Sequence, residues 1–165
     1  MTSRSRVLLF LLVAIVASLG VLYAQAQKKA PLPFPTGYRS WNHVKSMVIY
    51  SNESPFFEKF GGLHSIYVNS IGLTALQQGK AYPEGTVFVY DLHDTRTFRG
   101  TIETRGRKFI VMMKKNSKLY KETGGWGFEI FRADEQKGSL GDMKQCFSCH
   151  ASQKRADYVY STYTP

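Results

Sequence analysis

The chain has 165 residues, with 22 Lys and Arg against 12 Asp and Glu, which gives a formal net charge of +10 at pH 7. This length is enough for one domain with its own hydrophobic core. The basic excess either keeps the surface soluble or steers the protein toward an acidic redox partner or an anionic membrane. Because the lysines are spread along the chain and the N-terminus resembles an export signal, we do not expect a nucleic-acid-binding protein.

The first 26 residues have the pattern of an export signal. Arg4 and Arg6 form a positive segment, an apolar stretch extends from Val7 to Ala17, and residues 24–26 match the A-x-A cleavage pattern. The stretch 7–24 is almost long enough for an uncleaved membrane anchor, but the cleavage pattern favours removal. Cleavage removes two arginines and no acidic residue, which leaves a net charge of +8. In either case we expect a domain outside the cytoplasm, in the periplasm.

Residues 27–37 form a leader with proline at every second position from Pro31 to Pro35. This spacing excludes a helix, so we interpret the leader as an extended linker that is able to wrap onto the domain. From Tyr38 onward there is no internal repeat, low-complexity tract or second linker. We therefore expect residues 38–165 to form one domain.

The middle of the chain predicts mainly β structure, which makes the expected fold class α+β. Patterns of β-branched and aromatic residues predict strands at Leu63–Val68, Thr86–Leu92, Lys108–Met113 and Trp126–Phe131. In the second of these strands, Val87 and Val89 share one face while Phe88 and Tyr90 share the other, so both faces are expected to be buried. Glycines at positions 100 and 106 indicate an extended hairpin arm between the second and third strands.

Two short helices complete the expected fold. Ser70–Gln78 predicts a helix with Ser70 as N-cap and Gly79 as C-cap. A second helix is expected to begin near Asp142, close to the C-terminus. This second helix would carry the motif that contains both cysteines of the chain.

The motif Cys146-Phe147-Ser148-Cys149-His150 matches C-x-x-C-H, the attachment sequence of c-type haem. Its two thiols form thioethers with the haem vinyl groups, and the imidazole of His150 binds the iron from the proximal side. A thioredoxin-type redox pair would lie near an early βαβ unit, and a structural zinc site would need a second ligand pair that this sequence lacks. The motif therefore predicts one covalently bound haem c per chain.

The position of the motif narrows the kind of cytochrome. Only 15 residues follow His150, so any group on the distal side of the haem must come from the preceding strands. Small electron-transfer cytochromes c have an early motif and a downstream methionine ligand. Cytochromes c′ have a late motif, but their four amphipathic helices are missing here.

Several segments in this order resemble the cytochrome P-460 family, which includes cytochrome P-460 and cytochrome c′-beta. The resemblance covers roughly residues 38–165, and its matching segments are Gly62–Asn69, Gly79–Thr86, Lys115–Ser117, Gly124–Phe128 and Cys146–His150. It implies a mainly antiparallel β domain, often a dimer, that holds a five-coordinate haem with an open distal side. In hydroxylamine-oxidising members a strand lysine is linked to the haem and a distal carboxylate handles protons. Cytochrome c′-beta instead has an apolar distal pocket that binds nitric oxide.

The chain departs from the hydroxylamine-oxidising pattern at two positions. Tyr90 stands at the position of the cross-linking lysine, and Val111 at that of the distal glutamate. Valine cannot act as a base, whereas Phe60 and Val111 suit an apolar pocket for a diatomic ligand. Glu103 and Glu129 are the remaining nearby acids, and neither occupies the matching position.

Tyr90 is either a core tyrosine with a satisfied hydroxyl or a distal-pocket residue that donates a hydrogen bond to a bound ligand. At this matched position we prefer the pocket role, and a covalent link from Tyr90 to the haem is a further hypothesis. Trp126 and Phe128 are expected to pack against the haem or in the core. Weaker candidates for a distal iron ligand are His43, His64, His93, Met47, Met112, Met113 and Met143, of which His64 is expected to be a hydrogen-bonded structural histidine.

These observations predict an exported mono-haem c-type protein that binds a small ligand such as nitric oxide at five-coordinate haem. An oxidoreductase acting on hydroxylamine or a related nitrogen compound is the first alternative. A six-coordinate electron carrier is the second. A linked Tyr90 with turnover would favour the enzyme, and a distal His or Met ligand would favour the carrier.

Overall fold

A computed structural model describes residues 31–140 and 142–164. The predicted export signal and the start of the leader lie outside these described residues. The described elements belong to a folded unit that spans Leu32–Pro165. Among the described residues, no helix is both long and apolar enough to cross a membrane.

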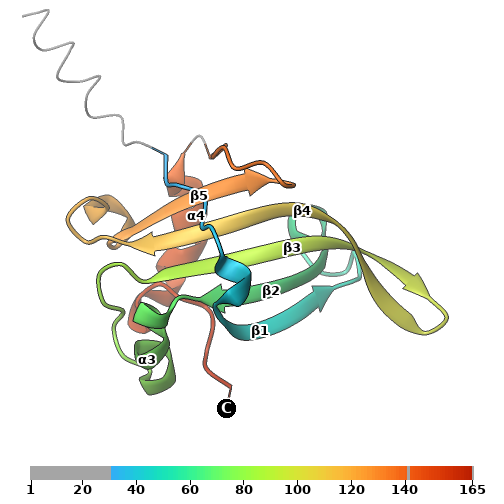
Figure 1. Ribbon diagram of the computed structural model, residues 1–165, viewed down its shortest axis with the longest axis horizontal. Helices are drawn as coiled ribbons and strands as arrows, with labels where there is room; N and C mark the ends of the chain where they lie inside the picture. The colour runs from blue at the N-terminus through green and yellow to red at the C-terminus, as the bar shows by residue number, and fades with distance from the viewer. Residues whose placement is uncertain (1–30, 141, 165) are drawn as a thin grey trace, which may run out of the picture. The chain divides into compact units, whose positions relative to one another are not determined.

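The unit is built on one five-stranded antiparallel sheet whose strand order follows the chain, as Figure 1 shows. The strands are β1 (Asn42–Ile49), β2 (Gly62–Val68), β3 (Val87–Phe98), β4 (Thr101–Lys115) and β5 (Trp126–Arg132). Beyond their neighbours, β3 and β4 continue as a two-stranded arm that ends in a turn at Arg99 and Gly100, both with positive φ. The arm agrees with the predicted hairpin, whereas β1 was not predicted.

Short helices connect and cover the strands. They are η1 (Tyr38–Ser40), α2 (Phe57–Phe60), α3 (Ser70–Gln78), η2 (Lys121–Thr123), α4 (Met143–His150) and η3 (Ala151–Ala156). The predicted bounds of α3 are confirmed, but its N-cap is Asn69 and not Ser70. Asn69 is extended, and its side-chain oxygen accepts hydrogen bonds from the amides of Gly72 and Val87, so it caps α3 and ties it to β3.

The leader covers one face of the sheet, which we call the leader face. Leu32 and Tyr38 are buried against Val89 and Ile110, and the ring of Phe34 lies 5.2 Å from that of Phe131. Figure 1 shows residues 32–41 crossing in front of the sheet, on the side opposite α4. This part of the leader therefore contributes to the core.

The second face of the sheet, which we call the haem face, is covered by α3, α4 and the C-terminal segment. Its core contains Phe88, Trp126 and Phe128, together with Leu76 of α3 and Val159. Cys146 and Phe147 of α4 pack against this core. The alternation predicted for β3 is confirmed, and the fold is α+β with mainly β structure, as the sequence indicates.

Candidate haem site

Helix α4 presents the two cysteines and the histidine of the C-x-x-C-H motif. Asp142 caps the helix by accepting a hydrogen bond from the amide of Lys144 at 2.9 Å. Cys146 and Cys149 are three residues apart, which brings them to neighbouring positions on one side of the helix. Both thiols are free, and burial raises the pKa of the Cys146 thiol to about 11.

His150, the last residue of α4, is oriented by the C-terminal segment. Its Nδ1 donates a hydrogen bond to the carbonyl oxygen of Tyr158 at 2.8 Å. A carbonyl can only accept, so Nδ1 carries the proton and Nε2 keeps its lone pair for a metal. The imidazole lies 5.1 Å from the ring of Phe128 and 5.3 Å from that of Tyr160. This tautomer leaves His150 able to bind a metal through Nε2, and the two rings restrict the orientation of its imidazole.

The carbonyl of Tyr158 is itself held by a network around Asp157. The Asp157 carboxylate accepts hydrogen bonds from Lys115 Nζ at 2.6 Å and from the amide of Tyr82 at 3.0 Å. Its carbonyl oxygen accepts a hydrogen bond from Trp126 Nε1 at 2.8 Å. Asp157 and Tyr158 both have positive φ, so these contacts hold a backbone shape that non-glycine residues rarely adopt.

Four side chains form a row across the middle of the haem face, which we call the central row. The strand register places Ile66, Tyr90, Val111 and Ile130 directly opposite one another on β2, β3, β4 and β5. All four are half-buried, whereas the adjacent row of Val68, Phe88, Met113 and Phe128 is buried. The central row is thus an apolar strip with one hydroxyl, next to the row on which His150 packs.

An aromatic cluster lies beyond the central row, on the side away from His150. The Phe60 ring lies 6.1 Å from the ring of Tyr90 and 6.0 Å from that of Phe109. The imidazole of His64 stacks on Tyr90 with 4.4 Å between centroids and 25° between planes. The structure therefore brings the predicted pocket residues Phe60, Tyr90 and Val111 onto one part of the haem face and adds His64 to them.

The polar groups of this cluster have no partners within the part of the chain that the structure describes. The Tyr90 hydroxyl forms no hydrogen bond there, and His64 Nδ1 is fully buried without a partner. Burial raises the pKa of Tyr90 well above its usual value, so its hydroxyl stays protonated. Burial, followed by the charge of Lys45, lowers the pKa of His64 to about 4, so the imidazole is neutral at pH 7. The prediction that His64 is hydrogen-bonded is therefore wrong.

The two acids that the sequence left as candidates do not lie in this cluster. Glu103 is on the hairpin arm and accepts hydrogen bonds from Arg96 Nε and Nη2 at 2.9 and 2.7 Å. Glu129 is buried but pairs with Met112, so it points to the face opposite Tyr90 and Val111. Its carboxylate accepts a hydrogen bond from the amide of Leu140 at 2.8 Å.

The other candidate ligands are also placed elsewhere. His43 is exposed and lies 2.9 Å from the Ser46 hydroxyl, while His93 lies 3.2 Å from the Asp91 carboxylate on the leader face. Met47 is exposed, Met112 is in the core under the leader, Met113 packs in the haem-face core, and Met143 lies in the first turn of α4. His64 alone among these seven candidates lies in the aromatic cluster.

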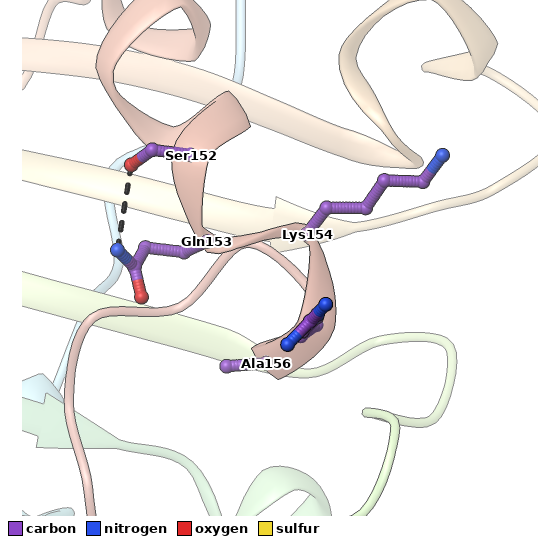
Figure 2. A pocket seen from close by; sticks show the side chains of 5 residues that line it. Ser152, Gln153, Lys154 and Ala156 are labelled. Carbon is purple, nitrogen blue, oxygen red and sulfur yellow. Dashed lines mark hydrogen bonds between the residues drawn. The ribbon is translucent and has the colours of Figure 1, made fainter.

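An open hollow of about 650 Å³ lies on η3, directly after His150. Figure 2 shows the residues that line it, which are Ser152, Gln153, Lys154, Arg155 and Ala156. All of them come from one segment, and none belongs to the motif, the central row or the aromatic cluster. Since ligand pockets are built from residues that converge from several elements, we assign the ligand side to the haem face instead.

The arrangement of these residues fits a haem. Two thiols, an imidazole with its Nε2 free and a half-exposed apolar row lie on the same face of the sheet. Fold and site together define a haem protein with a mainly β domain. A family model for cytochrome P-460 matches residues 35–161, and the chain therefore belongs to the cytochrome P-460 family. A search of curated proteins finds no match to the chain.

Proposed function

We propose that the protein is an exported c-type cytochrome that binds a small ligand, with nitric oxide the leading candidate. Cys146 and Cys149 would hold the haem through thioethers, and His150 would bind its iron. The iron would supply the position at which the ligand coordinates.

The observation that carries this proposal is the central row with its aromatic cluster. Phe60, Phe109 and Val111 are half-buried apolar side chains that would exclude competing water, and the Tyr90 hydroxyl would be the hydrogen-bond donor among them. A bound diatomic ligand needs a vacant iron position, an apolar surrounding and at most one donor. The site offers the apolar surrounding and the donor. At the position of the distal glutamate, Val111 has no group that could accept a proton.

The two alternatives predict different chemistry at the same residues. An oxidoreductase acting on hydroxylamine would be favoured by a covalent bond between Tyr90 and the haem, in place of the lysine of related enzymes. An electron carrier would need a second axial ligand. His64 is the nearest candidate, but its ring lies flat against Tyr90.

Export, partner and assembly also belong to this proposal. The pattern of residues 1–26 supports periplasmic export, and the basic charge supports an acidic redox partner. The edge strand β1, with Met47 exposed on it and Tyr50 exposed directly after it, supports a homodimer, which light scattering of the purified protein would test.

The ultraviolet-visible spectrum of the ferrous holoprotein, before and after addition of nitric oxide, tests the function. A high-spin c-haem spectrum that changes on addition supports ligand binding. A strongly red-shifted Soret band before addition would indicate a modified haem and favour the oxidoreductase. A low-spin spectrum that does not respond would contradict both and leave the electron carrier.

A further inference from the structure

His64 is a buried polar residue that the proposed function leaves unexplained. Its side chain is 2% exposed, and its Nδ1 has no hydrogen-bond partner in the part of the chain that the structure describes. Buried polar atoms in folded proteins nearly always have a partner, so an exception needs a reason. The other such atom among the described residues is Thr86 Oγ1, which lies near Gly72 of α3 and away from the aromatic cluster.

The place of His64 in the sheet points to the ligand side of the site. It pairs with Leu92 on β3, and Tyr90 is its diagonal neighbour on the same face. Along the strands, the row of Phe128 comes first, then the central row, then the row of His64 and Phe109. Because His150 packs on Phe128, His64 lies on the opposite side of the central row from the proximal histidine.

The chemistry of a neutral imidazole differs from that of the neighbouring tyrosine. Tyr90 stays protonated and is suited to donate a hydrogen bond. A neutral histidine has one N–H and one lone pair, and is therefore able to accept a proton as well. The cluster contains no carboxylate, since Glu103 and Glu129 lie elsewhere. His64 is thus the one side chain of the aromatic cluster with a free basic nitrogen.

We infer that His64 is the proton acceptor of the ligand pocket, for ligands that arrive as neutral acids and bind as anions. This inference rests on the proposed function, because it needs a vacant iron position. With hydrocyanic acid as the ligand, the H–C bond would break and the cyanide anion would keep the electron pair with which it binds the iron. The imidazole would take up the proton and, because its pKa is about 4, pass it on to solvent at pH 7. Carbon monoxide has no proton to lose and needs no acceptor.

The test compares holoproteins of wild type, His64→Leu and His64→Gln. Stopped-flow mixing gives the association rate constants of cyanide with the ferric protein and of carbon monoxide with the ferrous protein. We expect both substitutions to slow cyanide association by about 10²-fold, the lower end of the effect of a positioned base. Glutamine keeps a hydrogen-bonding group but cannot hold a proton, so it should fail as leucine does. Carbon monoxide association should stay as in wild type.

Two control variants separate the proton acceptor from other effects. His43→Leu removes an exposed histidine of β1 that contacts Ser46 and Tyr67, and should leave both rate constants unchanged. Tyr90→Phe keeps the ring on which His64 stacks but removes the hydroxyl, and should slow cyanide far less than His64→Leu does.

The outcomes distinguish this inference from the proposed function. Wild-type cyanide rates in both His64 variants would overturn the inference and leave the ligand-binding proposal standing. Loss of carbon monoxide binding together with cyanide binding in both variants would overturn it in favour of a structural role for His64. A wild-type protein that binds neither ligand would overturn the vacant iron position and the inference with it.

Discussion

The side chain of Tyr158 lies over Gly124, so closely that a Cβ at Gly124 would clash with the Tyr158 ring. The carbonyl of the same tyrosine accepts the hydrogen bond from His150 Nδ1 at 2.8 Å. Because Gly124, between β4 and β5, has no side chain, Tyr158 can take the position in which its carbonyl orients His150. Hydrogen bonds to the outer nitrogen of a ligating histidine raise its basicity, so this contact would also tune an iron bound by His150.

Gly124→Ala should lower the stability of the fold and raise the reduction potential of the haem. Gly79→Ala is its matched control, because Gly79 has a similar φ of +60° against +64°, but no atom lies within 4 Å of the place that its Cβ would take. The control Gly79→Ala should lower the free energy of unfolding by about 1 kcal/mol, because of backbone strain alone, and should leave the reduction potential unchanged. Gly124→Ala should cost more, and its weaker His150 contact should raise the reduction potential. Urea unfolding and potentiometric titration measure these two effects, and equal behaviour of the variants would contradict the prediction.

Substitution of Cys146 or Cys149 should weaken covalent haem attachment, whereas substitution of Ser148, which lies between them, should not. Cys149→Ser should leave one thioether, which is measured as a red-shifted pyridine haemochrome spectrum of haem that still resists acid extraction. The double variant Cys146→Ser, Cys149→Ser should release all haem on extraction. Ser148→Ala is the control, because Ser148 is exposed and only bonds the carbonyl of Gln145 on the same helix. Covalent haem in the double variant would exclude the proposed attachment.

Tyr90→Phe should weaken the hold on a bound diatomic ligand without disturbing the aromatic cluster. Phenylalanine keeps the stacking on His64 and the contact with Phe60, but it lacks the donor hydroxyl. The loss of one neutral hydrogen bond should raise the dissociation rate of nitric oxide from the ferrous protein by about five- to tenfold. Flash photolysis or ligand exchange measures this rate. An unchanged rate would assign Tyr90 to the core, and a haem-bearing peptide with the mass of a Tyr90 adduct would support the enzyme alternative.

Asp91 should stabilise the fold at neutral pH through its contacts on the leader face. It is 2% exposed and accepts hydrogen bonds from the Tyr38 hydroxyl at 2.7 Å and from Arg107 Nε at 2.8 Å. Burial alone would raise the pKa of Asp91, but the hydrogen bonds from Arg107 and Tyr38 and the nearby positive charges outweigh it and lower the pKa. The stabilisation is therefore present above about pH 4 and is lost as the pH falls through the lowered pKa.

Asp91→Asn tests this contribution. The substitution removes the buried charge that pairs with Arg107 and should lower the free energy of unfolding by about 3 kcal/mol at pH 7. The difference between wild type and variant should shrink as the pH falls below about 4. Circular dichroism of urea unfolding over this pH range measures it. A difference that stays constant with pH would show that the Asp91 charge is not responsible.

Local signals in the sequence were sufficient for much of the fold. The alternation in Thr86–Leu92, the glycine after Gln78 and the aspartate before Met143 each act within a few residues, and the structure agrees with them. The strand β1 was not predicted because its pattern is mixed, with Val44 buried but Met47 exposed. Pairing with β2 supplies the stability that its own residues do not signal.

The sequence by itself determined the chemistry at the end of the chain, since C-x-x-C-H places two thiols and an imidazole on one helix whatever the rest of the fold does. Only the tertiary structure decided what faces that helix. The antiparallel register brings His64, Tyr90 and Val111 together from three strands, and the two-residue period of a strand turns Glu129 to the opposite face. A shift of one residue in the pairing of a strand would turn its side chains to the opposite face. The strand register therefore decides which polar groups face the pocket.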